Sequence, residues 1–355
     1  MLTPTTSYER KRIRSALLRW YRLHARLLPW RATNSPYAIW VSEVMLQQTQ
    51  VATVIPYYRR FLRRFPTLAH LAQAPLERVL EVWSGMGYYR RARHLHRAAR
   101  TINEKFGGRF PQNYEQARAL PGIGDYTARA ILSIAYNQPY AVLDGNVARV
   151  IARLLALQGH LPQPPFRRAV QSELELLLSR RQPGNLNQSL MELGQTVCLP
   201  RAPRCPACPL RKWCRAHQLG EPESYPVPRP RRAGEPRHLA VAVIRRGSKV
   251  AMVRGLGEGL LEDLWNFPAA FGNSRPEALC RLQEKLRALV PGSAVTCKPA
   301  GKLRHRITYR AIRVQVYPAE APPAASGDSL RWFSITSLTQ GAISQLARKI
   351  AKQAL

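Results

Sequence analysis

The chain has 355 residues, of which 55 are Lys or Arg and 21 are Asp or Glu, so its net charge is +34 at pH 7. A globular protein with this excess of positive charge repels itself unless its partner is a polyanion, which favours nucleic acid as the ligand. An arginine-rich proteome would supply part of the excess. A membrane surface is disfavoured because no expected helix has an apolar face opposite a lysine-rich one. Without an apolar leader or membrane-spanning run, we expect a protein of a reducing compartment.

Residues 7–219 are predicted to be mostly helical. Apolar residues recur there at three- and four-residue spacing, and prolines separate most of the stretches. The expected helices are 10–27, 37–64, 76–106, 114–120, 125–136, 145–157, 166–180 and 188–196.

The segment 40–51 carries an acidic residue, Glu43, between apolar neighbours on a predicted helix. A surface position on an exposed turn is the simpler interpretation. A buried carboxyl group without a cationic partner has a raised pKa and can donate a proton at neutral pH. Glu43 is therefore a candidate general acid.

Residues 120–128 read Leu-Pro-Gly-Ile-Gly-Asp-Tyr-Thr-Ala and lie between two short predicted helices. Gly122 and Gly124 let backbone N–H groups point outward at a helix N-terminus, where a phosphate is favoured. An ordinary tight turn would also use two glycines, but the stretch that follows favours a helix-hairpin-helix that grips a nucleic-acid backbone.

The stretch 142–149 places Asp144 at the expected start of a helix, with Asn146 in its first turn. Asp is a preferred N-cap residue, so capping alone explains it. Asp144 is also one of few acidic residues in a basic chain, about twenty residues after the hairpin. A carboxylate at that place is suited to face C1′ of a nucleotide whose backbone the hairpin holds.

Four of the six cysteines lie within seventeen residues, at positions Cys198, Cys205, Cys208 and Cys214. A disulfide framework is disfavoured because the chain lacks a secretory segment. Zinc remains possible, although only Cys205 and Cys208 form a CxxC pair. The spacing favours a 4Fe–4S cluster held by the loop 198–214. The basic residues between these cysteines indicate that the loop lies against an anion.

Residues 220–237 contain five prolines and several charges, which is typical of a linker. Beyond it the hydrophobic pattern changes to a period of two. Strands 239–244 and 249–253 are predicted to form a hairpin, and 309–317 a further strand. With helices 276–289 and 343–352, residues 238–355 are predicted to be an α+β domain.

Together these motifs resemble the endonuclease III superfamily of DNA glycosylases. Within it, Trp30-Arg31, the segment around Glu43, Gly85-Met-Gly-Tyr-Tyr89 and Leu-Asp144-Gly-Asn146-Val resemble the adenine DNA glycosylase (MutY) family. The resemblance is dense over residues 25–215. Residues 239–355 resemble that family's Nudix-like C-terminal domain, mainly through 259–268. The fold class implied is a multidomain one, with an all-α glycosylase domain (1–219), a linker (220–237) and an α+β Nudix-like domain (238–355).

The resemblance implies a role for each matching residue. Glu43 would protonate the departing adenine and Asp144 would stabilise the positively charged sugar. Tyr126 and Asn146 would hold the nucleotide and Asp144. Contacts to DNA are implied for Arg31 near the adenine pocket, the two hairpin glycines, and residues that probe the duplex and the lesion, namely Gln48, Thr49, Tyr88 and Thr308.

The chain departs from its relatives at three places. Bifunctional members carry a lysine nucleophile where this chain has Tyr126, so a monofunctional enzyme is expected. The lesion-contacting Phe-Ser-His segment of the family corresponds here to Ile307-Thr308-Tyr309, which keeps the hydroxyl and replaces the His. Residues 272–290 lack the glutamates of a Nudix catalytic box, so hydrolysis of nucleoside triphosphates is not expected.

We therefore predict a base-excision-repair glycosylase that removes adenine paired with 8-oxoguanine, or with guanine, and leaves an abasic site. Its expected partner is double-stranded DNA, with no membrane, as a monomer in the nucleoid of a bacterial-type cytoplasm. A thymine-mismatch glycosylase and a non-catalytic DNA-binding cluster protein are the alternatives. The segment 47–50 and the second domain disfavour the first, and the presence of both Glu43 and Asp144 disfavours the second.

Overall fold

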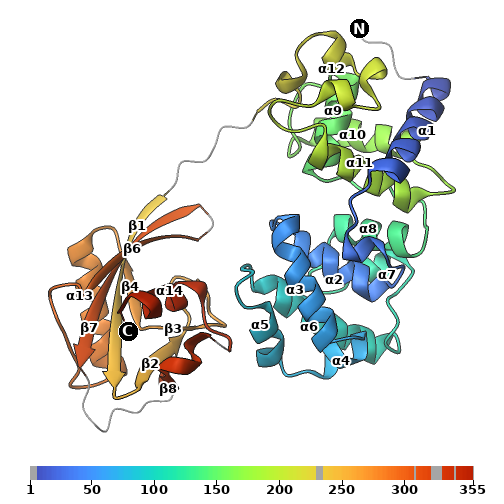
Figure 1. Cartoon of the computed structure of the whole chain (residues 1–355). Helices are drawn as coiled ribbons and strands as arrows, with labels where there is room; N and C mark the ends of the chain where they lie inside the picture. Colours follow the sequence, from blue (N-terminus) through green and yellow to red (C-terminus); the bar gives the residue numbers. More distant parts are fainter. Residues whose placement is uncertain (1–5, 229–234, 308, 321–329, 340, 355) are drawn as a thin grey trace. The chain divides into compact units, whose positions relative to one another are not determined.

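The computed structural model describes residues 6–228, 235–307, 309–320, 330–339 and 341–354. The chain divides into two compact units, coloured along the sequence in Figure 1. The first unit is Met1–Gln73 with His94–Pro230, and the second is Ala74–Arg93 with Arg231–Leu355. Nothing in the sequence indicates that residues 74–93 pack with the C-terminal half. The domain limits 1–219, 220–237 and 238–355 remain a prediction.

The first unit is helical in its described residues, as predicted. Its helices are α1 (Ser7–His24), α2 (Pro36–Leu46), α3 (Val51–Arg64), α4 (Leu68–Gln73), most of α6 (Arg90–Lys105), α7 (Tyr114–Arg118), α8 (Asp125–Ala135), α9 (Gly145–Leu155), α10 (Pro164–Leu177), α11 (Pro183–Thr196) and α12 (Arg215–Gln218). Short 3-10 turns lie at Pro29–Arg31, Cys205–Ala207, Arg211–Trp213 and Pro222–Ser224.

Two packing arrangements position the site in this unit. Helix α2 packs against α3 and α8, and nine of its eleven residues are buried, which explains why its sequence is apolar on every side. Helix α9 packs against α10, α11 and α12, and its apolar residues lie in a core that also contains residues of α1.

Two of the predicted helices were wrong because each contains a break. The stretch 37–64 is divided into α2 and α3 by a turn in which Gln48 has a φ of 57°. The stretch 76–106 is divided into α5 (Leu76–Trp83) and α6 by a turn in which Tyr88 has a φ of 51°. A left-handed backbone is uncommon for residues other than glycine and concentrates at functional sites. The two breaks place two predicted DNA-probing residues at turns.

The second unit contains an α+β domain, as predicted. Its strands are β1 (Glu235–Arg246), β2 (Lys249–Arg254), β3 (Trp265–Asn266), β4 (Ala269–Gly272), β5 (Ala294–Val295), β6 (Gly301–Ile307), β7 (Arg310–Glu320) and β8 (Leu330–Ser334), and its later helices are α13 (Arg275–Leu289) and α14 (Gln345–Ala354), with a 3-10 turn at Ile335–Thr339.

The sheet is built around β1. Its described strands run in the order β3-β2-β1-β7-β5, with β4 paired to β1, β6 to β7 and β8 to β2. Strand β1 is parallel to β7 and antiparallel to β2, and the predicted hairpin joins Arg246 to Lys249. Leu239, Val241 and Val243 lie in the core that includes α14, whereas the alternate residues of β1 lie in the core that includes α13. This alternation is the period-two pattern of a strand buried on both faces.

Residues 74–93 join the second unit through polar contacts. The Ser84 hydroxyl donates to the carbonyl of Ile343 at 3.2 Å and accepts from Arg348 at 2.9 Å. Arg93 pairs with Asp263 at 2.8 Å.

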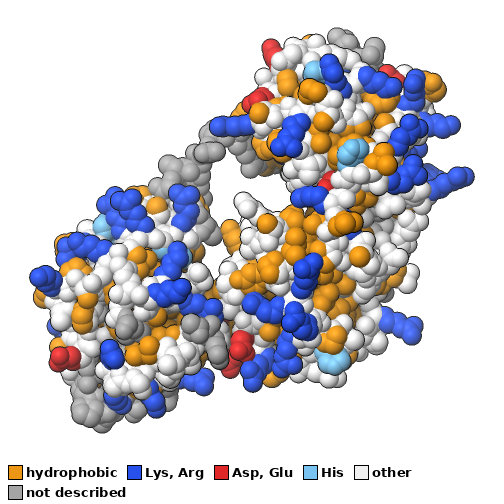
Figure 2. Space-filling model, viewed as in Figure 1, with side chains coloured by type: hydrophobic (Ala, Val, Ile, Leu, Met, Phe, Trp, Pro, Cys, Tyr) orange, Lys and Arg blue, Asp and Glu red, His pale blue; other side chains and the backbone are white. Residues whose placement is uncertain are grey.

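Figure 2 shows basic side chains spread over the visible face. In the ranges that the structure describes, no helix has the length and apolar composition needed to span a membrane.

Candidate active site

The first unit contains a cavity of about 690 Å³ that brings the four predicted catalytic residues together. Predicted DNA contacts also lie on its wall. Among the lining residues are Glu43, Tyr126, Asp144, Asn146, Arg31, Gln48 and Thr49. Residues separated by more than a hundred positions in the chain therefore share one site.

Glu43 is buried on helix α2, with 6% of the residue exposed, so the surface alternative is wrong. Burial raises the pKa of Glu43 to about 7, because water no longer solvates the charged form. The hydrogen bond with the Tyr126 side chain lowers this pKa, and the negative charge of Asp144 raises it. At neutral pH the carboxyl group is held between its protonated and ionised forms.

Tyr126 is the second residue of α8 and is hydrogen bonded to Glu43. Burial, followed by the charges of Glu43 and Asp144, raises the pKa of Tyr126 well above its ordinary value. The phenol therefore keeps its proton at neutral pH and can donate to the ionised form of Glu43.

Asp144 is the N-cap of α9, so the simple interpretation of its position is correct. One of its oxygens accepts from the backbone N–H of Val147 at 2.7 Å. The other accepts from the Asn146 amide at 3.0 Å. Both partners donate hydrogen bonds, and the positive end of the helix dipole lies beside them, which suits a negatively charged carboxylate. Capping and the predicted role as a charge stabiliser are thus compatible.

Arg149 connects this N-terminus to the cysteine loop. It donates to the Asn146 amide oxygen at 3.0 Å, to the carbonyl of Gly194 at 2.7 Å and to the carbonyl of Cys198 at 2.8 Å. Helices α9 and α11 meet closely here, because a Cβ added to Gly194 would lie 2.7 Å from the Cβ of Asn146. The backbone on both sides of Asp144 is therefore tightly placed.

The predicted helix-hairpin-helix is confirmed as α7, a hairpin and α8. Gly122 has a φ of 76°, and a Cβ on it would lie 2.5 Å from that of His94, so glycine is required. Gly124 is the N-cap of α8 and a Cβ there would meet no atom within 4 Å. The space beside Gly124, at the N-terminus of α8, is therefore open. Phosphate binding by the two glycines remains a prediction.

The four clustered cysteines are free thiols, each partly buried. Cys198 is close enough to Cys205, Cys208 and Cys214 for charge–charge interactions. Arg153 of α9 donates to the Cys198 sulfur at 3.4 Å, so a cationic group lies beside the cysteine set.

Within the described residues no three His, Cys, Asp or Glu side chains are placed to hold a single metal ion. A four-iron cluster takes each thiolate on a different iron, so its ligands surround a larger group. The donor set and its cationic neighbour fit such a cluster. The cluster itself remains a prediction.

Tyr88 is not among the residues that line this cavity. Tyr88 belongs to the second unit and is 44% exposed. It lies on the wall of a separate pocket of about 590 Å³ in that unit, together with His305, Arg306 and Ile307. Thr308, the next residue in the chain, lies outside the described residues.

Sequence reasoning missed several residues of the site. Arg26, Arg149 and Gln188 line the cavity, and Glu192 binds two of its arginines. Glu192 could have been noticed in the sequence, because it is an acidic residue inside the apolar stretch 190–197. Its partners lie more than 160 positions away, so no local pattern shows them.

Comparison with known proteins agrees with this geometry. The HhH-GPD superfamily base excision DNA repair protein family matches residues 41–176. Adenine DNA glycosylase of Mus musculus is 34% identical over 394 residues, covering 95% of this chain and 76% of the mouse protein. Adenine DNA glycosylase of Buchnera aphidicola (subsp. Acyrthosiphon pisum, strain APS) is 34% identical over 270 residues, covering 76% of this chain and 77% of the Buchnera protein. A thermostable thymine-DNA glycosylase of known structure has a TM-score of 0.55 and 27% identity, covering 61% of this chain and all of its own.

The raised pKa of Glu43 predicts how its replacement changes stability with pH. Between its ordinary pKa of 4.5 and its folded pKa of about 7, the folded protein binds one more proton than the unfolded chain. The free energy of unfolding therefore falls as pH rises through this window. Relative to wild type, Glu43→Gln should gain up to about 3 kcal/mol in unfolding free energy between pH 5 and pH 8.

Urea unfolding of the full chain at the two pH values measures this gain. Glu104→Gln, which removes an exposed carboxylate on α6, is the control and should show no gain. An equal difference between Glu43→Gln and wild type at pH 5 and pH 8 would show that Glu43 is already ionised at the lower pH.

Proposed function

The chain belongs to the adenine DNA glycosylase family, and we propose that it hydrolyses the N-glycosidic bond of adenine mispaired in double-stranded DNA. The observation that carries the proposal is the pair of carboxyl groups in one cavity, with Glu43 able to hold a proton and Asp144 placed among donors. We further propose that the enzyme is a monomer and that it acts in the bacterial nucleoid.

This pair of groups matches the charges that develop in the reaction. As the bond between C1′ and the base nitrogen breaks, its electrons move to the base and the sugar becomes positively charged. Glu43 gives its proton to a ring nitrogen of the adenine, which leaves as the neutral base. The Asp144 carboxylate stabilises the sugar cation. A water molecule then adds to C1′ and its proton returns to Glu43, so an abasic site remains and the acid is restored.

Tyr126 supports a monofunctional enzyme. A lyase reaction needs an amine that forms a Schiff base with C1′. This position is occupied by a partly buried phenol that keeps its proton, so it acts by holding Glu43. No strand cleavage is expected from the cavity.

Duplex DNA is supported as the substrate by charge and by the hairpin. The net charge of +34 supplies an attraction for phosphate that does not depend on sequence. The hairpin N–H groups at the start of α8 suit one phosphate near Tyr126. A base must leave the helical stack to enter a cavity in which Glu43 is almost fully buried.

A thymine-mismatch glycosylase is the second candidate, because a thymine-DNA glycosylase shares the helical fold. The full length of that protein matches 61% of this chain, which leaves most of the second unit of this chain without a counterpart. The mouse adenine DNA glycosylase, by contrast, covers 95% of this chain. The second unit thus favours the adenine reaction.

Recognition of 8-oxoguanine is the finer part of the proposal. The pocket of the second unit combines the left-handed turn at Tyr88 with the end of strand β6 at His305, Arg306 and Ile307. An exposed aromatic ring beside polar and backbone groups is suited to a base edge, and the C8 oxygen and N7 hydrogen distinguish the lesion from guanine. Thr308 follows this strand directly.

We also propose that the loop 198–214 holds one 4Fe–4S cluster through Cys198, Cys205, Cys208 and Cys214. Such a cluster would fix the loop and its basic residues, and it is a centre able to exchange electrons. In this chain Arg153 links the loop to α9, donating to the carbonyls of Leu199 and Pro200 at 2.6 and 2.9 Å.

Replacing either carboxyl group should stop excision and spare binding. Glu43→Gln and Asp144→Asn are each expected to slow adenine release by roughly 10²–10⁴, while the Kd for the duplex changes little because phosphate contacts dominate affinity. Single-turnover assays on A·8-oxoG, A·G, T·G and thymine glycol duplexes measure this, with Glu115→Gln as the exposed control. Adenine excision by both variants at wild-type rate would refute the assignment, and excision of thymine alone would favour the second candidate.

The cluster assignment is tested by metal content. The purified protein should be brown and contain about four irons and four sulfides per chain. Cys205→Ser should lower iron content, DNA affinity and unfolding free energy together, since metal binding closes the loop. Cys280→Ser changes an exposed thiol of the second unit and should lower none of them. Stoichiometric zinc without visible absorption would contradict the assignment.

The lesion pocket is tested by the ratio of two rates. Thr308→Ala should reduce the preference for A·8-oxoG over A·G about tenfold, because one good contact to a base edge is worth about 1–3 kcal/mol. Lys302→Ala, at an exposed position of β6, should leave the ratio unchanged. If Thr308→Ala has no effect and His305→Ala lowers the ratio, the described side of the pocket reads the lesion. An unchanged ratio in both variants would refute recognition by this pocket.

A further inference from the structure

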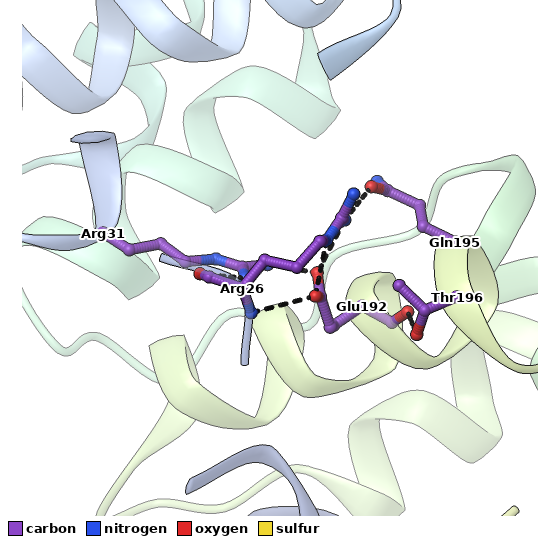
Figure 3. A network of polar contacts seen from close by, with 5 residues as sticks. All are labelled: Arg26, Arg31, Glu192, Gln195 and Thr196. Atoms are coloured by element: carbon purple, nitrogen blue, oxygen red, sulfur yellow. Dashed lines mark hydrogen bonds and ion pairs between the residues drawn. The ribbon is translucent and has the colours of Figure 1, made fainter. Parts of the chain in front are cut away.

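Glu192 is a fully buried carboxylate between two arginines, as Figure 3 shows. Arg26 donates to it through Nε at 2.6 Å, through Nη2 at 2.7 Å and through its backbone N–H at 3.1 Å. Arg31 donates through Nη2 at 2.7 Å. Burial alone would raise the pKa of Glu192, but the hydrogen bonds from both arginines outweigh it and hold this pKa at about 2. The carboxylate is thus ionised at every working pH.

Further contacts fix both guanidinium groups. Arg31 also donates to the backbone carbonyl of Arg26 at 3.1 Å and lies over the ring of Tyr21. Arg26 also donates to Gln195 at 2.6 Å. Arg26 is therefore held by a fork-like pairing with the carboxylate. Arg31 is held by one hydrogen bond to Glu192 together with its contacts to the Arg26 carbonyl and the Tyr21 ring.

The two arginines lie on the wall of the catalytic cavity, at different depths. Arg31 has 14% of its side chain exposed and Arg26 has 37%. Arg31 also lines a second cavity of about 320 Å³ in the same unit, so it forms part of the partition between the two. Arg31 thus belongs to the interior wall, and Arg26 to the more open part.

Stability alone is a poor reason for this arrangement. Removing Glu192 and most of Arg31 from water is expensive, and well-packed apolar residues often stabilise a protein as much or more. The arrangement leaves one net positive charge on a wall of the cavity that contains Glu43 and Asp144. We propose that Glu192 is a positioning residue for the excision reaction, acting through Arg31.

The inference rests on the proposed function, in which electrons flow onto the departing base. A guanidinium fixed on the cavity wall meets that developing charge without having to reorganise during the reaction. Without Glu192, Arg31 loses its charged partner and can shift within a cavity that also contains Asp144, whose negative charge the sugar cation needs. One carboxylate therefore keeps the positive group beside the base and away from the sugar.

The test separates this role from plain stability by means of a matched ion pair. Arg10 and Glu173 form a similar two-point pair, at 2.8 and 2.8 Å, between α1 and α10 and away from the cavity. Glu173→Gln and Glu192→Gln should both lower Tm. Only Glu192→Gln should slow single-turnover excision, by about 10²-fold, the loss that a misplacement of about 1 Å can produce. Glu192→Asp keeps the charge and the fold and should slow excision by a smaller factor.

A double-mutant cycle shows whether Arg31 is the intermediary. If it is, Glu192→Gln should add little to the loss already caused by Arg31→Met, since residues that act as one unit are not additive. Equal slowing by Glu192→Gln in both backgrounds would overturn the proposal, and so would wild-type excision by Glu192→Asp and Glu192→Gln. A wild-type protein that releases no adenine would instead refute the proposed function.

Discussion

The burial of Glu43 is the constraint on which the site depends. Helix α2 packs against α3 and α8, so the carboxyl group in its middle has little access to bulk water and has Tyr126 as its hydrogen-bonding partner. The same helix ends at Leu46 and leads directly into the turn with Gln48. The packing that raises the pKa of the acid therefore also places the residues predicted to probe DNA, and a change in one is expected to move the other.

Helix α9 is the second rigid part. Its N-cap is Asp144, and one turn apart on its surface Arg149 and Arg153 bind carbonyl groups of residues 198–200. An eleven-residue helix thus has the proposed catalytic carboxylate, Asp144, at one end and the cysteine loop along its side. Because 2% of Arg153 is exposed, its contacts are shielded from water and the link is stiff. The loop and the carboxylate share one rigid support, whatever the loop binds.

Local patterns predicted the parts of this site that depend on local structure. The hairpin, the N-cap Asp144 and the buried Glu43 follow from residues that are neighbours in the chain. The turn at Gln48 was missed because the apolar periodicity continues through it. Gly85 and Gly87 could have indicated the second break, at Tyr88. The pairing of Glu192 with Arg26 and Arg31 depends on how α11 packs against the segment after α1, and no sequence pattern encodes that distance. In the second unit, two-residue strands such as β3 and β5 are too short to show a period.

The cavity illustrates how one type of group acquires opposite properties. Glu43 and Glu192 have the same side chain and both are buried, yet the pKa of the first is held at about 7 and that of the second at about 2. The difference lies in their partners, a phenol for Glu43 and two guanidinium groups for Glu192. Were a guanidinium of this cavity to pair with Glu43, its charge would lower the pKa of that carboxyl, and the proton that the proposed reaction uses at neutral pH would be lost. In a chain with 55 basic residues, a carboxyl group keeps its proton at neutral pH only where no arginine pairs with it. Glu192 provides that separation for the two arginines of the same cavity wall, so the ion pair and the proton donor are two parts of one electrostatic arrangement.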